Sequence, residues 1–237
     1  METGNEPETV RGVTIDEGGL RIDLDQPELP QAKPSELSFR VLAEDGSAVT
    51  DFEVEHERRM HLIVARRDLT GFQHLHPEMA EDGTWSTQIN LPEAGAYRVF
   101  ADFNHEGESL TLGQDLVVDG DAEYQELPTQ ETEFVTGSGY AVRVEGQAAQ
   151  AGQESELAFD VTRNGEPVEV EPYLGADGHL VALREGDLAF LHVHPEEHGD
   201  GVGFAATFPT AGRYRLFLQF KHDGAVQTVA FTQEVSR

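Results

Sequence analysis

The sequence predicts an all-β protein built as a tandem repeat of two immunoglobulin-like β-sandwich domains. Three observations predict this fold: apolar and polar residues alternate with period two, turn signals separate the alternating runs, and the second half of the chain repeats the first. The alternation is clear over residues 37–41 in the first half and 157–161 in the second. No segment shows a sustained helical period.

The repeat divides the 237 residues into two domains of ordinary size. We place domain 1 at residues 10–119 and domain 2 at residues 136–237. The segment 120–135 is polar and acidic and contains Pro128, so we expect a linker there. The steps Gly95-x-Tyr97 and Gly212-x-Tyr214 predict a tyrosine corner at the start of strand F in each domain.

Histidines occur at the same points of both repeats and are the best indication of function. Eight of the ten histidines take part, and imidazole is the commonest metal-binding side chain. The offset between partners is 118 residues for three pairs and 117 for the fourth, and the eight candidate metal ligands are His61, His74, His76, His105, His179, His192, His194 and His222. His56 and His198 have no repeat partner, so we expect structural roles for them. We expect Met60, Trp85 and Phe204 in the core.

The turn residues predict how these histidines meet. Residues 184–187 form a natural two-residue hairpin turn, because Gly186 supplies a positive φ at its second central position. That register places His179 directly opposite His192, with Cβ atoms about 4.5–5.5 Å apart. His194 lies two residues further and projects from the same face.

The first repeat gives the same prediction. Pairing Arg66 with Leu69 places His61 opposite His74, with His76 as a diagonal neighbour. Strand F neighbours strand C in this fold, so His105 and His222 at its end are expected as fourth ligands. The alternative interpretation, packing histidines in a shared core, is left open by the sequence.

Composition excludes several functional classes. The chain has 16 basic and 45 acidic residues and a formal net charge of −29, which argues against nucleic-acid binding. It has no cysteine, so disulfides and thiolate metal sites are impossible. The apolar runs are too short to cross a bilayer, and the first residues lack the apolar region of a signal peptide. Composition alone leaves a cytoplasmic protein or a mature exported domain open.

The histidine motifs support a family resemblance. Residues 55–64 and 66–77 look like the first half, and residues 171–180 and 191–195 the second half, of bacterial and archaeal exported or lipid-anchored tandem β-sandwich proteins of unassigned role. These proteins are often described as heavy-metal-associated, with a His-x-His-Pro motif in each repeat, and look related to periplasmic copper-handling β-sandwiches. The resemblance implies an extracellular or cell-envelope location and suggests copper. Asp177 stands where we expect methionine or an aromatic residue, which argues against a thioether ligand for Cu(I) in repeat two.

The function we expect is metal sequestration or delivery by an exported protein. Three or four neutral imidazoles suit Cu(II) or Zn(II), and the affinity order for nitrogen sites favours copper over zinc. The alternative is a non-enzymatic interaction module for an envelope protein partner, with structural histidines. An enzyme is the weaker interpretation: the spacing from Gly186 to His192 and His194 resembles the start of a cupin motif, but the second cupin motif is missing.

The acidity also predicts a salt-loving protein. With 29 excess negative charges and two lysines, mutual repulsion should destabilise the fold at low ionic strength. Screening extends over about 10 Å at 0.1 M salt and shortens above it. We therefore expect the melting temperature to climb steadily with added KCl; a flat response would leave solubility as the reason for the acidity.

Overall fold

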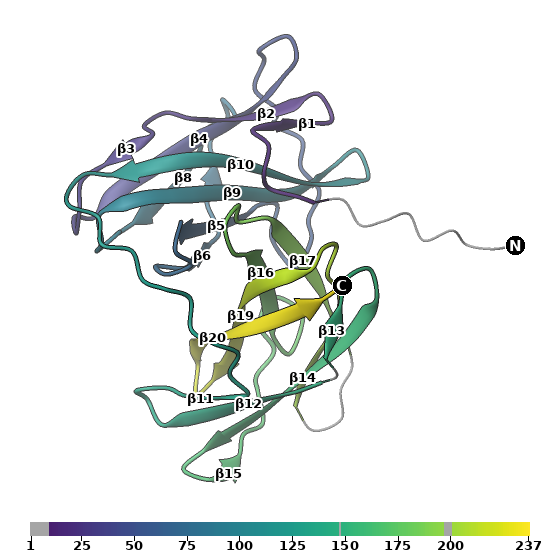
Figure 1. Ribbon diagram of the computed structural model, residues 1–237. Helices are drawn as coiled ribbons and strands as arrows, with labels where there is room; N and C mark the ends of the chain where they lie inside the picture. The colour runs from purple at the N-terminus through teal and green to yellow at the C-terminus, as the bar shows by residue number, and fades with distance from the viewer. Residues whose placement is uncertain (1–9, 147, 197–200) are drawn as a thin grey trace, which may run out of the picture. The chain divides into compact units, whose positions relative to one another are not determined.

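The computed structural model describes residues 10–146, 148–196 and 201–237 (Figure 1). All twenty regular elements in these ranges are β-strands, which confirms the all-β prediction. Among the described residues, no helix has the length and apolar character needed to span a bilayer. The chain divides into two compact units, composed mainly of residues 11–126 and 127–237, which we call domain 1 and domain 2.

Domain 1 consists of two five-stranded sheets. The first has the order β1-β2-β4-β8-β7, formed by Asp16–Glu17, Leu20–Leu24, Ser35–Ala43, Trp85–Ile89 and Glu78–Met79. The second has the order β3-β10-β9-β5-β6, formed by Glu28–Leu29, Glu108–Val118, Gly95–His105, His61–Arg66 and Gln73–Leu75. Strand β5 pairs with β9, the neighbour relation predicted for strands C and F.

Domain 2 repeats this strand order in one continuous sheet. Strand β17 pairs with β16 along one part and with β18 along another, so it joins the halves that β6 and β7 keep separate in domain 1. Figure 1 shows the strands of domain 2 in teal-green to yellow. The order is β11-β12-β14-β18-β17-β16-β19-β20-β13, with bounds Glu133–Val135, Tyr140–Gly146, Glu154–Arg163, Val202–Thr207, Phe190–Glu196, His179–Arg184, Gly212–His222, Ala225–Ser236 and Ala149–Gln150; β15 (Glu166–Pro167) pairs with β14.

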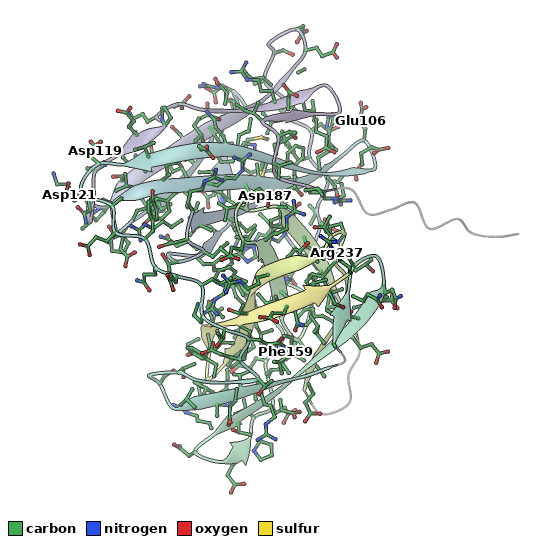
Figure 2. The ribbon with its side chains drawn as sticks, in the orientation of Figure 1. Glu106, Asp119, Asp121, Phe159, Asp187 and Arg237 are labelled. Atoms are coloured by element: carbon green, nitrogen blue, oxygen red, sulfur yellow. The ribbon has the colours of Figure 1, made fainter. Side chains whose placement is uncertain are left out.

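The period-two pattern produces one apolar cluster in each domain; Phe159, labelled in Figure 2, belongs to that of domain 2. In domain 1, Leu37, Phe39 and Val41 of β4 are fully buried, because alternate residues of the strand face the opposing sheet. The predicted core positions are confirmed: Met60, Trp85 and Phe204 are each 1% exposed.

Both predicted tyrosine corners are confirmed. The Tyr97 hydroxyl donates to the Glu93 carbonyl at 2.9 Å, and the Tyr214 hydroxyl donates to the Thr210 carbonyl at the same distance. Burial raises the pKa of Tyr97, so its hydroxyl keeps the proton that this bond requires. Each bond ties a long strand, β9 or β19, to the chain segment that precedes it.

The corner in domain 1 can be tested with the chain's single tryptophan, Trp85, as reporter. Tyr97→Phe removes one buried hydrogen bond and should lower the free energy of unfolding by about 1 kcal/mol. Denaturant titration followed by Trp85 fluorescence measures the change. Tyr124→Phe is the control, because Tyr124 is 52% exposed and water can replace its bond; an equal loss in both variants would contradict a special role for the corner.

Candidate metal centre

The β5–β6 hairpin brings the histidines together, but not in the predicted register. Ile63 pairs with His74, so the prediction of His61 directly opposite His74 is wrong by two residues. Domain 2 is shifted in the same way, since Val181, not His179, pairs with His192. A shift of two residues keeps every side chain on its predicted face, because side chains alternate with period two.

The loop accounts for part of this shift. The Leu69 amide donates to the Arg66 carbonyl at 2.8 Å, as the predicted turn requires, but the Arg66 amide donates to the Thr70 carbonyl at 2.9 Å, which makes the loop one residue longer. Leu69 takes a left-handed backbone (φ 64°) while it is 3% exposed. Its burial favours the longer loop, which the sequence pattern of polar turn residues did not indicate.

Arg66, at the end of β5, is buried and holds this loop from inside the domain. Its side chain is 2% exposed and pairs with Asp68 at 3.0 Å and with Glu93 at 2.8 Å. The same guanidinium donates to the Ala94 carbonyl at 3.0 and 2.7 Å and to the Glu123 carbonyl at 2.9 Å. A buried charge is tolerated only when it is paired and hydrogen-bonded, and Arg66 meets both conditions.

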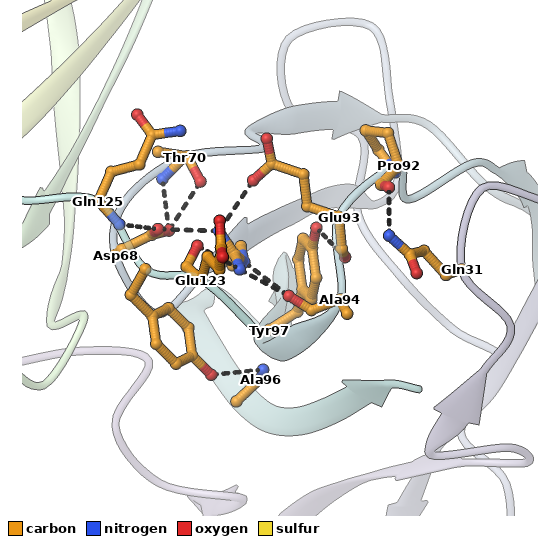
Figure 3. A network of polar contacts seen from close by, with 12 residues as sticks. Gln31, Asp68, Thr70, Pro92, Glu93, Ala94, Ala96, Tyr97, Glu123 and Gln125 are labelled. Atoms are coloured by element: carbon orange, nitrogen blue, oxygen red, sulfur yellow. Dashed lines mark hydrogen bonds and ion pairs between the residues drawn. The ribbon is translucent and has the colours of Figure 1, made fainter. Parts of the chain in front are cut away.

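Asp68 connects Arg66 to the turn and to the following chain. One carboxylate oxygen accepts from the Thr70 amide and hydroxyl at 3.3 and 2.7 Å; the other accepts from the Gln125 amide at 2.9 Å (Figure 3). Gln125 lies in the predicted linker, so this part of it is fixed to domain 1. The loop after β5, and hence the hairpin with its histidines, is set by a buried ion pair.

His61, His74 and His76 form the cluster of domain 1. One nitrogen from each ring lies within 4.8 Å of the others, close enough for a single ion to reach all three. The His61 and His74 nitrogens Nδ1 and Nε2 are 3.0 Å apart. The ring centroids are 5.3 Å apart for His61 and His74, 5.1 Å for His61 and His76, and 4.7 Å for His74 and His76.

A backbone carbonyl fixes the tautomer of His61. Its Nε2–H donates to the Glu55 carbonyl at 3.2 Å, and a carbonyl can only accept. In the neutral ring Nδ1 therefore carries the lone pair, which accepts from the Nε2–H of His74. A backbone carbonyl that accepts from the other ring nitrogen typically orients histidines that bind metals, and here it directs the basic nitrogen toward the cluster.

Domain 2 repeats this arrangement at His179. Its Nε2–H donates to the Tyr173 carbonyl at 2.9 Å, the counterpart of the bond to Glu55. The side chains of His192 and His194 lie outside the part that the structure describes. Their backbones lie in β17, where His192 pairs with Val181 and His194 with Ala205.

The described cluster contains none of the other predicted ligands, and the side chains of two of the proposed partners of His222 lie outside the described residues. His105 bonds through Nδ1 to the Asp51 carbonyl at 2.7 Å and is not one of the three clustered residues. His222 bonds through Nδ1 to the Tyr140 hydroxyl at 2.8 Å. His198 lies outside the described residues. His56, expected to be structural, has its ring centroid 6.2 Å from that of His61.

Sequence reasoning missed Asp102. It pairs with His61 across β5 and β9, so it shares the face of the histidines, and it is 4% exposed. Its carboxylate accepts from the Thr111 hydroxyl at 2.7 Å. Gln219 takes the corresponding place opposite His179, so at this position of β19 domain 2 has a carboxamide where domain 1 has a carboxylate. The relation of strands C and F gave a signal that could have identified both residues.

Comparisons with known proteins support the domain division and leave function unassigned. The sequence profile described as "Domain of unknown function (DUF8832)" matches twice, over residues 13–120 and 134–237. No curated protein matches the chain.

Similar solved structures include a DUF4426 family protein from Pseudomonas aeruginosa PAO1, the Escherichia coli adhesin FdeC, and Salmonella alpha-2-macroglobulin. For these three, in that order, the identity is 14%, 13% and 14%, and the TM-score is 0.34, 0.32 and 0.33. The matches cover 45%, 97% and 97% of this chain. They cover 97%, 66% and 15% of the other chains, so this chain spans only part of the adhesin and of the macroglobulin.

The ion pair that shapes the hairpin gives a stability prediction. Asp68→Ala leaves Arg66 buried without its enclosed partner, so the free energy of unfolding of domain 1 should fall by roughly 3 kcal/mol. The matched control is Asp115→Ala, which removes a 56% exposed carboxylate from Arg98 and should cost less than about 1 kcal/mol. Trp85 fluorescence in urea measures both; equal losses would contradict a special role for the buried pair.

Proposed function

This chain belongs to the family of the domain of unknown function DUF8832, and we propose that it binds a divalent metal, copper before zinc, through a histidine cluster in each domain. The observation that carries the proposal is the set of three imidazole nitrogens within 4.8 Å of one another, with the His61 tautomer fixed by a carbonyl. Such an arrangement can coordinate an ion without a change of backbone.

The chemistry follows from the tautomers. His61 would bind through Nδ1, because its Nε2–H is held by Glu55. His74 donates its Nε2–H to His61, so it would shift its proton to Nδ1 and offer Nε2 to the ion. The hydrogen bond between the two imidazoles would then be replaced by two metal–nitrogen bonds. Protons compete for the same nitrogens, so affinity should fall as the pH drops through the imidazole range.

The same proposal applies to domain 2, with His179, His192 and His194 as ligands. The support is the repeated sequence and the bond from His179 to Tyr173, which leaves Nδ1 as its basic nitrogen. The sequence predicts His105 and His222 as fourth ligands, but His105 bonds through Nδ1 to the Asp51 carbonyl and we do not include it in the domain 1 site. The biological role proposed is metal sequestration or delivery by an exported protein in the cell envelope or outside it, without enzymatic activity.

Calorimetric titration with Cu(II) and Zn(II) tests this function. Wild-type protein should take up one ion per domain, His74→Ala and His192→Ala should each lose one, and the double variant should lose both. The matched control is His105→Ala together with a melting curve for every variant. If wild type takes up no more metal than the double variant, the histidines are structural and the envelope interaction module becomes the better interpretation.

A further inference from the structure

A tight turn just before β5 carries a histidine that the repeat does not explain. Glu55 and Arg58 exchange backbone hydrogen bonds at 2.8 and 2.9 Å, and the two residues between them, His56 and Glu57, have φ of 47° and 62°. Two consecutive left-handed residues define a turn that favours asparagine and glycine. Neither residue here is of that kind, so the turn is built at a conformational cost.

Domain 2 forms the same turn without a histidine. Tyr173 and Ala176 exchange the backbone bonds, and the central residues are Leu174 (φ 53°) and Gly175 (φ 78°). In both domains the carbonyl at the start of the turn accepts from the first histidine of the next strand. The turn and its role in orienting that histidine are therefore common to both domains, and neither requires an imidazole at the tip.

The position of His56 places it beside the cluster. It is half-buried, and its ring stands edge-on to that of His61, at 79° between planes and 6.2 Å between centroids. His61 is 5.3 and 5.1 Å from the rings of His74 and His76, so His56 is the next imidazole out from the same ring. To share an ion with these rings, His56 would have to change to another of its staggered rotamers.

We propose that His56 is the fourth ligand of the domain 1 metal centre and completes a site of four imidazoles. The inference rests on the proposed function. A tetrahedral ion takes four protein ligands when its site is closed and three plus water when it is open. Leu174 has no ligand atom, so the turn of domain 2 cannot complete a site in this way. The domain 1 site would therefore bind its ion more tightly than the domain 2 site, and the domain 2 site would release its ion more readily.

The test copies the turn of domain 2 into domain 1. In a His192→Ala background, which removes one proposed ligand of the second site, His56→Leu puts leucine where Leu174 adopts the same backbone conformation. His56→Asn is a second variant, because asparagine tolerates left-handed φ. His105→Ala is the matched control, since it removes the other candidate for the fourth position.

Two measurements are made on each variant: the Zn(II) dissociation constant by competition with a chromophoric chelator, and the visible spectrum with Co(II) as probe. Both His56 variants should still bind one ion but at least tenfold more weakly, and their Co(II) bands should change as water replaces an imidazole. His105→Ala should match its His192→Ala parent. Trp85 fluorescence confirms that each variant is folded.

The outcomes separate this inference from the proposed function. If His74→Ala abolishes binding while both His56 variants bind as their parent does, His56 is not a ligand and the three-histidine proposal stands. If His105→Ala weakens binding and the His56 variants do not, the fourth ligand is His105 and our inference is wrong. If the parent protein binds no Zn(II) or Co(II), the proposed function itself fails.

Discussion

Strand β5 is the element on which the candidate site depends, because one of its two faces is completely buried in the core. Leu62 and Val64 are fully buried in the cluster between the sheets of domain 1. Period two then forces His61 onto the other face, and the pairing with β6 brings His74 and His76 to the same side. Hydrophobic burial thus places the imidazoles on one face of the hairpin, since a one-residue slip that moved one strand's histidines to the other face would expose Leu62 or Leu75.

The buried ion pair of Arg66 and Asp68 determines the hairpin register, which hydrophobic burial alone does not determine. Registers that differ by two residues bury the same face, so apolar pattern alone cannot choose between them. The choice is made in the loop, where Arg66 and Asp68 bond each other, the turn and the following chain. Removing two charges from water is costly, so this network is tolerated only in the one arrangement that satisfies it. A charged pair far from the imidazoles therefore fixes how they are spaced.

This division explains which features the sequence could predict. Strand faces, core positions such as Trp85, and the corners at Tyr97 and Tyr214 follow from period and local motif, and the structure confirms them. The hairpin register was mispredicted because it depends on the burial of Leu69 and on contacts with residues far along the chain. The sequence analysis assigned His56 a structural role because comparison of the two repeats selects only the histidines that both contain. The position of His56 follows instead from an unusual backbone conformation at the turn.

Differences between the repeats carry as much information as their likeness. The shared parts, namely the hairpin, the turn carbonyl and the tyrosine corner, build a scaffold that orients the first histidine identically in both domains. The parts that differ lie around that histidine: Asp102 stands opposite His61 where Gln219 stands opposite His179, and His56 occupies the tip that Leu174 occupies in domain 2. A buried carboxylate adds negative charge beside a cation, and a carboxamide does not. Both differences would therefore make the proposed site of domain 1 bind a cation more tightly than the proposed site of domain 2.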